Sequence, residues 1–173
     1  MKINTTANKI TIARICLVPL FLAFSYFGRP YWAFLVYLLA CLSDFLDGYI
    51  ARHYNQVSVF GKFMDPLADK MLVLSAMCRF IELGYFPGWA VAIVIFREFA
   101  VSGLRLIAAQ KNIVIAAAKS GKLKTAVTMV CLGAMLLFGS HNIVNIISVI
   151  LILFTTLYSG CEYFKANYKV FEE

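Results

Sequence analysis

Charged residues are scarce in this chain, and their scarcity argues against a typical soluble domain. Only 14% of its 173 residues are charged, whereas 62% are hydrophobic, and soluble globular proteins have a very different balance. The length suits one domain, and we expect residues 1–173 to form a single domain with little chain left for a water-soluble part. The composition therefore predicts a membrane protein.

Cysteine and histidine are also too few and too scattered to suggest a redox or metal centre. The five cysteines lie inside apolar segments without a C-x-x-C pair, and we interpret them as packing residues. The sequence also lacks internal repeats, low-complexity segments and the inverted repeats that transporters often contain. These absences leave the apolar segments and a small set of charged residues as the informative features.

Six apolar segments account for most of the chain. A membrane-spanning helix needs about 20 mostly apolar residues, and such segments lie at roughly 9–27, 31–52, 66–83, 87–109, 121–139 and 143–164. The first segment contains Arg14 and no small-residue cleavage site follows it, so we expect it to belong to the fold. The sequence predicts an all-α, polytopic membrane protein with six transmembrane helices.

Basic residues gather at alternate connections between these segments. They precede the first segment, flank the second connection, crowd the fourth connection and recur at the C-terminal end, while the other connections contain almost none. The positive-inside rule then places both termini and the two longer connections in the cytoplasm. The net charge of +7 is explained by this topology and by attraction to anionic membrane lipids, without a nucleic-acid partner.

All four aspartates lie in two short stretches, "SDFLDGYIAR" and "DPLAD". On a helix with about 100° per residue, Asp44, Asp47, Gly48 and Ala51 fall within an arc of about 100°. Two carboxylates thus share a face with two residues that have almost no side chain, which leaves room for a bulky nucleotide diphosphate. Arg52 follows on the same helix and could clamp a phosphate oxygen.

The second stretch places Asp65 and Asp69 four residues apart, on one face of the next helix. A purely structural interpretation has Asp65 capping that helix and the other carboxylates pairing with Arg52. Four clustered carboxylates repel one another, however, and each costs about 2.5 to 3.5 kcal/mol at membrane depth. Divalent cations remove the repulsion, and oxygen-only ligands favour Mg²⁺ or Mn²⁺ over zinc. Pairs of such ions recur in phosphoryl-transfer sites.

The spacing of these residues resembles a known signature. "DFLDGYIARHYNQVSVFGKFMDPLAD" fits D-x2-D-G-x2-A-R-x8-G-x3-D-x3-D at every fixed position, which is similar to the CDP-alcohol phosphotransferase family of membrane enzymes. "NKITIARICLVP" resembles the family's N-terminal N-x2-T-x2-R segment. "IFREFAVSGLR" and "SGKLKTAVTMV" resemble segments of its bacterial phosphatidylglycerophosphate synthases.

The resemblance implies a direct displacement in which an acceptor hydroxyl attacks the β-phosphorus of CDP-diacylglycerol and CMP is released. It implies that Asp69 is the catalytic base, and it suggests a homodimer. The implied ligands of two Mg²⁺ or Mn²⁺ ions are Asp44, Asp47, Asp65 and Asp69. The implied CDP-lipid-binding residues are Asn8, Thr11, Gly48, Ala51 and Arg52.

Basic residues inside the later segments indicate an acceptor that carries a phosphate. Arg97 lies near the middle of the fourth segment and Arg105 about two turns further on, while Lys122 and Lys124 open the fifth. A neutral or zwitterionic acceptor would leave this cluster without an anion, whereas glycerol 3-phosphate would satisfy it. A lysine at such a helix end can also be a topology signal alone. Glu98 is expected to pair with a basic residue of a neighbouring helix.

We therefore expect a phosphatidyltransferase that uses CDP-diacylglycerol and glycerol 3-phosphate in a bacterial cell membrane, with its active site facing the cytoplasm. A cardiolipin synthase, whose acceptor phosphatidylglycerol also carries a phosphate, and a phosphatidylinositol-phosphate synthase are the nearest alternatives. Two alternatives belong to other classes of protein. A divalent-cation transporter would need carboxylates near the bilayer centre on broken helices, whereas these cluster at one cytoplasmic edge. A non-catalytic scaffold predicts that Asp44→Asn leaves function intact.

Overall fold

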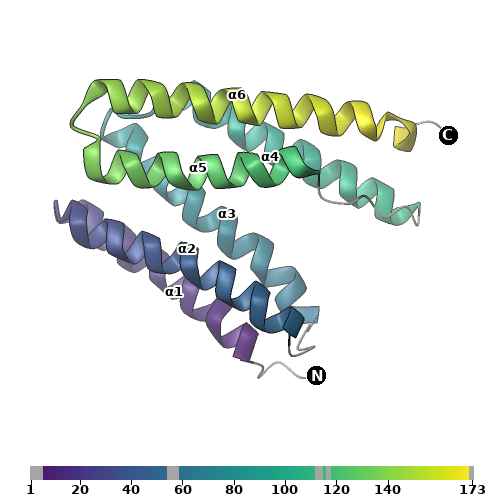
Figure 1. Ribbon diagram of the computed structural model, residues 1–173, viewed down its shortest axis with the longest axis horizontal. Coiled ribbons are helices and arrows are strands. Elements are labelled where there is room, and N and C mark those ends of the chain that lie inside the picture. The colour runs from purple at the N-terminus through teal and green to yellow at the C-terminus, as the bar shows by residue number, and fades with distance from the viewer. Residues whose placement is uncertain (1–5, 54–58, 112–114, 116–117, 172–173) are drawn as a thin grey trace. The chain divides into compact units, whose positions relative to one another are not determined.

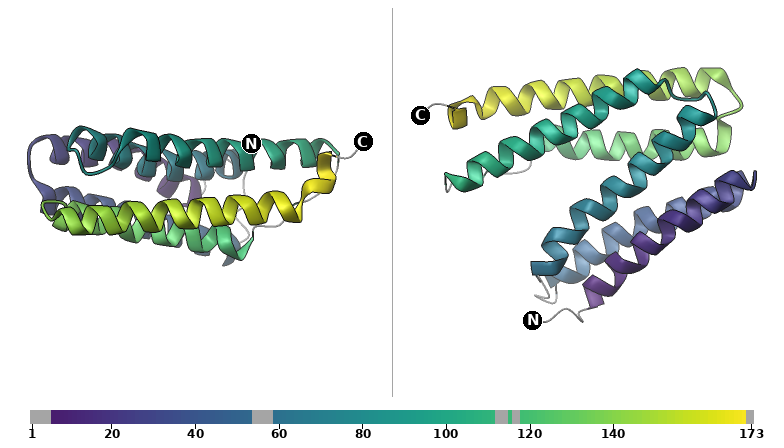
Figure 2. Two further views of the ribbon diagram at one scale, coloured as in Figure 1. Left: turned by 90° about the horizontal axis from the view of Figure 1, so that it is seen from above. Right: turned by 180° about the vertical axis from the view of Figure 1, so that it is seen from behind.

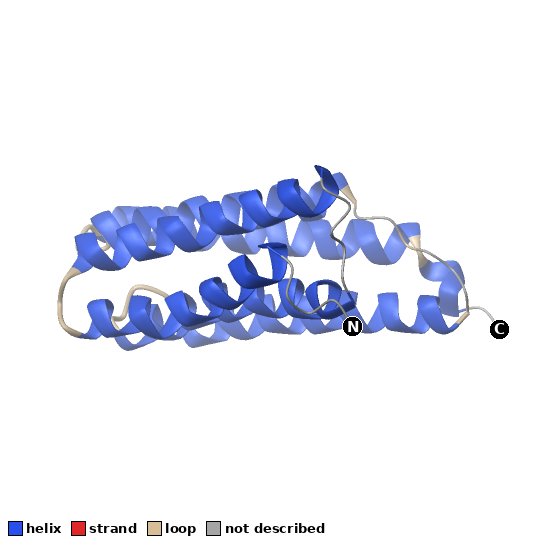
Figure 3. Ribbon diagram, turned by 90° about the horizontal axis from the view of Figure 1, so that it is seen from below, coloured by secondary structure: helices blue, strands red, loops and turns tan. Residues whose placement is uncertain are grey.

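Six α-helices form the described part of the chain in the computed structural model (Figures 1 and 3). They are α1 (Thr6–Tyr26), α2 (Pro30–His53), α3 (Val59–Glu82), α4 (Gly88–Gln110), α5 (Lys119–Phe138) and α6 (Asn142–Ala166), followed by the 3-10 helix η1 (Tyr168–Phe171). The structure describes residues 6–53, 59–111, 115 and 118–171, with side chains except at 6–9, 44–53, 59–63, 65, 66, 69, 169 and 171. These ranges contain no strand, so the all-α prediction is confirmed.

Most helix ends lie within a few residues of the predicted segments, but α3 does not. It begins at Val59, well before the predicted start at 66, because hydropathy detects the continuous apolar part of a helix and misses first turns that Gly61 and Lys62 interrupt. Asp65 therefore lies inside the helix, and the interpretation of Asp65 as a helix cap is wrong.

Among the residues that the structure describes, two helices, α5 and α6, are long and apolar enough to cross a membrane. Shorter apolar stretches occupy Ile10–Tyr26 in α1 and Pro30–Ser43 in α2. Large apolar side chains on α4 and α5 are strongly exposed, with Phe96 at 77% and Val130 at 72%, as expected for helix faces that contact lipid. The six spans and the cytoplasmic location of both termini stay predictions.

The chain divides into two compact units, residues 1–83 with 136–138 and residues 84–135 with 139–173. In the first unit α1 packs against α2 and α3, and α2 contacts α3 (Figure 2). Ala33 and Ala40 of α2 are fully buried, and small residues of this kind let helix backbones approach closely. The single-domain prediction stays a prediction.

Arg79 of α3 joins the C-terminal ends of α1 and α3 in the first unit. Its guanidinium donates to Ser25 Oγ (3.2 Å) and to the Ser25 carbonyl (3.3 Å), and it lies 4.3 Å from the centre of the Tyr26 ring. Arg79 also pairs with Glu82 (2.9 Å), which accepts a hydrogen bond from the Tyr26 hydroxyl (2.9 Å). Gly28, with φ of 65°, supplies the left-handed residue that ends α1. These contacts fix α1 against α3.

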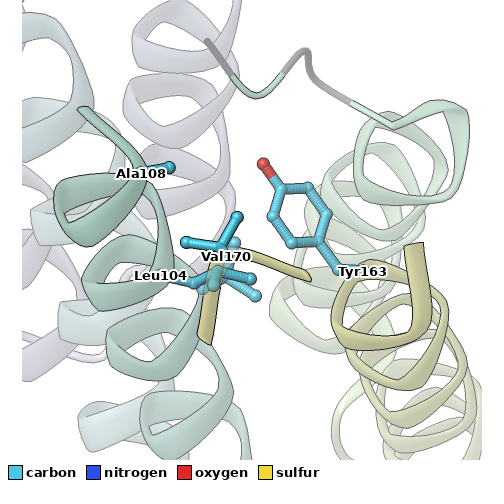
Figure 4. Packing of buried hydrophobic residues seen from close by; sticks show 5 residues of the cluster. Leu104, Ala108, Tyr163 and Val170 are labelled. Atoms are coloured by element: carbon cyan, nitrogen blue, oxygen red, sulfur yellow. The ribbon is translucent and has the colours of Figure 1, made fainter. Parts of the chain in front are cut away.

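In the second unit α4 packs against α6, and η1 contacts α4. Figure 4 shows the hydrophobic cluster that joins them. It consists of Val101, Leu104 and Ala108 of α4, Tyr163 of α6 and Val170 of η1. The Lys111 ammonium adds a hydrogen bond to the Val170 carbonyl (3.0 Å). This packing sets the orientation of α4, and hence of its arginines, against α6.

All five cysteines are free. Cys131 is buried as expected, but Cys16, Cys78 and Cys161 are exposed, so the packing interpretation is wrong for these three. Because a thiol behaves as a small apolar group, such positions suit helix faces that contact lipid.

Candidate active site

The four predicted metal ligands lie on two helices that contact each other. Asp44 and Asp47 belong to α2, and Asp65 and Asp69 to α3. Because both segments are helical, each pair shares a helix face at its spacing of three or four residues. Outside the side chains that the structure describes lie those of Asn8, Asp44, Asp47, Gly48, Ala51, Arg52, Asp65 and Asp69.

Helix α1 contributes a buried cation, Arg14, that contacts the residue directly before the first aspartate. Arg14 is fully buried, and its Nε donates a hydrogen bond to Ser43 Oγ (3.1 Å). The Ser43 hydroxyl in turn donates to the Ala40 carbonyl (2.7 Å). Since Ser43 directly precedes Asp44, Arg14 fixes the turn of α2 that carries this aspartate. Thr11, a predicted CDP-lipid residue, is buried one turn before Arg14 on α1.

Arg97 and Lys124 are joined through Glu98 in the second unit. Arg97 Nη1 lies 3.0 Å from Glu98 Oε1, and Lys124 Nζ lies 2.7 Å from the same oxygen. The three side chains are 11%, 6% and 23% exposed for Arg97, Lys124 and Glu98 respectively. The prediction that Glu98 pairs with a basic residue of a neighbouring helix is confirmed. The Glu98 carboxylate thus connects α4 to α5, and removing one partner of a buried ion pair costs about 3 to 5 kcal/mol.

Arg97 is also held by Ser159 of α6. Its Nη2 donates to Ser159 Oγ (3.0 Å), and the Ser159 hydroxyl donates to the Thr156 carbonyl (3.2 Å). A Cβ atom at Gly160 would lie 3.3 Å from Arg97 Cγ, and one at Gly121 would lie 3.9 Å from Nη2. The two glycines therefore leave room for the arginine side chain. Its Nε is buried and has no hydrogen-bond acceptor among the described residues.

The first turn of α5 adds further features that suit an anion. Ala118, at the N-cap position, provides no side-chain cap, and the N–H groups of a helix N-terminus favour negative charge. The Ser120 hydroxyl in this turn is buried and has no hydrogen-bond partner in the described part of the chain. The turn and Arg97 together could bind a group with several anionic oxygens.

Arg105 contacts the same helix as Arg97, α6, but its partner Tyr163 lies one turn beyond Ser159. Its Nε donates to the Tyr163 hydroxyl (2.6 Å), and its guanidinium lies 5.3 Å from the centre of that ring. The Lys122 side chain is exposed and makes no ion pair or hydrogen bond with residues that the structure describes. The structure thus brings Arg97 and Lys124 together, directs both arginines to α6, and leaves Lys122 outside this network.

Sequence analysis missed Ser159 and Tyr163. Both lie in "YSGCEY", the part of the last helix with the most polar residues and a glycine. That local drop in hydropathy is the only signal that could have identified them, because their role depends on which face of α6 contacts α4.

Comparison with known proteins agrees with the signature. A family model described as CDP-alcohol phosphatidyltransferase matches residues 4–157, and the chain belongs to this family of enzymes. It is 37% identical to the "CDP-diacylglycerol--glycerol-3-phosphate 3-phosphatidyltransferase" of Bacillus subtilis (strain 168), with 94% of each chain covered. A protein of the same name from Rickettsia bellii (strain RML369-C) is 35% identical, over 99% of this chain and 100% of the relative.

A "Probable phosphatidylglycerophosphate synthase" of Mycobacterium tuberculosis (strain ATCC 25618 / H37Rv) is 33% identical, over 94% of this chain and 81% of the relative. The similarity to these bacterial proteins therefore covers both units of the chain. Together with the apolar helices, family membership indicates a membrane protein.

Proposed function

We propose that this protein is a phosphatidylglycerophosphate synthase of the CDP-alcohol phosphatidyltransferase family. It transfers the phosphatidyl group of CDP-diacylglycerol to the primary hydroxyl of sn-glycerol 3-phosphate, releasing CMP, in the synthesis of anionic phospholipids. The observation that carries the proposal is the similarity, over nearly the whole chain, to bacterial relatives named for this activity.

Divalent cations suit the donor set of α2 and α3. These helices contact each other and offer four carboxylates, which are the hard oxygen ligands that Mg²⁺ and Mn²⁺ prefer. We assign two such ions to Asp44, Asp47, Asp65 and Asp69. When bound, ions of this kind neutralise the pyrophosphate and stabilise the leaving oxygen.

The transfer itself is a single displacement at the β-phosphorus. The acceptor oxygen forms its bond to phosphorus, Asp69 takes the hydroxyl proton, and the bond to the bridging pyrophosphate oxygen breaks, with CMP as the leaving group. Most of the rate enhancement would come from positioning and charge neutralisation. The residues assigned to the CDP-lipid are Asn8, Thr11, Gly48, Ala51 and Arg52.

The acceptor's phosphate is assigned to four basic residues: Arg97, Arg105, Lys122 and Lys124. Charge-assisted hydrogen bonds from guanidinium and ammonium groups are the strong contacts to phosphate oxygens. The unpaired Nε of Arg97 and the uncapped first turn of α5 support an anion at this place. Lys122, which is exposed, would close over the bound phosphate from that turn.

We place the protein in the bacterial cell membrane with its active site facing the cytoplasm. The charge distribution supports this orientation, and one substrate is dissolved while the other is anchored by acyl chains. The proposal includes a homodimer, as the family resemblance suggests. Chemical cross-linking in membranes would give a band at twice the chain mass of 19.4 kDa, and a monomer band alone would contradict it.

The proposed function is tested by supplying acceptors one at a time. Purified protein in detergent receives CDP-diacylglycerol, MgCl₂ and either glycerol 3-phosphate, phosphatidylglycerol or inositol phosphate, and CMP release is followed. We expect release with glycerol 3-phosphate. Release only with phosphatidylglycerol would indicate a cardiolipin synthase, and release only with inositol phosphate a phosphatidylinositol-phosphate synthase. Divalent-metal flux in vesicles without any CMP would indicate a transporter.

A further inference from the structure

Two residues outside the assigned substrate contacts hold Arg97 at both ends of its guanidinium. Glu98 accepts a hydrogen bond from Nη1 and Ser159 accepts one from Nη2, each at 3.0 Å. The remaining nitrogen, Nε, is buried without an acceptor among the described side chains and backbone groups. A buried donor left unpaired is unfavourable. The Arg97 Nε–H is therefore well placed to donate a hydrogen bond to an oxygen atom of a bound ligand.

Neither residue is suited to bind the phosphate itself. The Ser159 hydroxyl proton is used by the Thr156 carbonyl (3.2 Å), which leaves its oxygen free to accept from Arg97. The Glu98 carboxylate is an anion that would repel a phosphate, and its Oε1 also accepts from Lys124 (2.7 Å). Their contacts point to a role that acts through the two basic residues.

We propose that Glu98 and Ser159 are positioning residues that orient Arg97 with its Nε–H presented to the phosphate of the acceptor. Glu98 also fixes the Lys124 ammonium beside it, so that two cations from different helices are held in place before the acceptor binds. Preorganised donors bind more tightly because they lose less conformational freedom on binding. This inference rests on the acceptor role proposed for Arg97.

The test compares Glu98→Gln and Ser159→Ala with two matched controls. Glu162→Gln makes the same change at an exposed carboxylate of α6, and Ser148→Ala removes another buried hydroxyl from the same helix. Steady-state rates of the purified protein in detergent micelles are measured against each substrate separately. Thermal unfolding of every variant reports its stability.

We expect each positioning variant to raise the KM for glycerol 3-phosphate on the order of tenfold, since hydrogen bonds to charged groups have this effect on binding. The KM for CDP-diacylglycerol should stay unchanged, and the controls should match the parent protein. The direction of the Glu98→Gln effect is informative because a purely electrostatic role predicts a lower KM, the site having lost a negative charge.

A KM for the acceptor that falls, or that matches the controls, would overturn the proposal. So would an equal change in both KM values, because a merely structural role would affect both. Ser159→Ala involves no charge and keeps the test valid if Glu98→Gln does not fold. The KM is read with whichever phosphate-bearing acceptor the parent protein uses. If the protein uses another phosphate-bearing acceptor, the proposed function is refuted, but the positioning role of Glu98 and Ser159 is still tested. If it uses an acceptor without a phosphate, the proposed function and the positioning role are both refuted.

Discussion

Replacing Arg97 with lysine should weaken binding of the acceptor substrate. The guanidinium makes two charged hydrogen bonds, to Glu98 and Ser159, and keeps Nε for the ligand. A lysine ammonium is a compact group without this planar fork, so it cannot reach both partners and the phosphate in the same geometry. Each hydrogen bond to a charged group contributes about 1.5 to 3 kcal/mol.

Loss of one such bond to the acceptor predicts a KM for glycerol 3-phosphate that is raised about 10- to 100-fold, since about 1.4 kcal/mol corresponds to a factor of ten. The assay follows CMP release while glycerol 3-phosphate is varied at saturating CDP-diacylglycerol. Arg79→Lys is the matched control, because Arg79 also donates to a serine and a glutamate in its own unit. It should lower the unfolding temperature without changing this KM. Equal KM values for the two variants would refute the reasoning.

Three further outcomes are expected. Tyr163→Phe removes the hydroxyl that binds Arg105 at 2.6 Å and should raise the KM for glycerol 3-phosphate by about tenfold. The control Tyr168→Phe, at an exposed ring, should leave this KM unchanged. Steady-state kinetics of both variants measure the two values. Gly160→Val crowds Arg97 Cγ, which lies 3.3 Å from the Cβ position, and should raise the same KM, while Gly103→Ala, in open space, should leave it unchanged. Chelation of divalent metal with EDTA should abolish CMP release, and added Mg²⁺ or Mn²⁺ should restore it. The Asp69→Asn variant should stay inactive with either ion. CMP release that persists in EDTA would exclude a metal-dependent reaction.

The helices themselves could be predicted from hydropathy because an apolar stretch of about 20 residues has few alternatives to a helix in a membrane. The start of α3 at Val59 could not, because its first turns contain a glycine and a lysine and lower the local hydropathy. That difference places Asp65, which the structural alternative treated as a cap, in the body of the helix. Its spacing from Asp69 is helical either way, and the predicted pairing of the two carboxylates stays a prediction.

The candidate acceptor site was only partly predictable. Arg97 and Lys124 are conspicuous in apolar segments, and the pairing of Glu98 followed from the high energy of an isolated carboxylate there. Ser159 and Tyr163 were not identified, because a hydroxyl in an apolar helix is common and its partner depends on the face that packs against α4. That face is set by the cluster of Leu104, Tyr163 and their neighbours, which no local pattern specifies.

The central claim is that this protein joins glycerol 3-phosphate to the phosphatidyl group of CDP-diacylglycerol. The most direct measurement supplies radiolabelled glycerol 3-phosphate and CDP-diacylglycerol to the purified protein with Mg²⁺ and determines both the label in extracted lipid and the CMP released. We predict that labelled lipid and CMP form in equal amounts and that Asp44→Asn forms neither. Label that stays in the aqueous phase, or CMP released without labelled lipid, would contradict the claim.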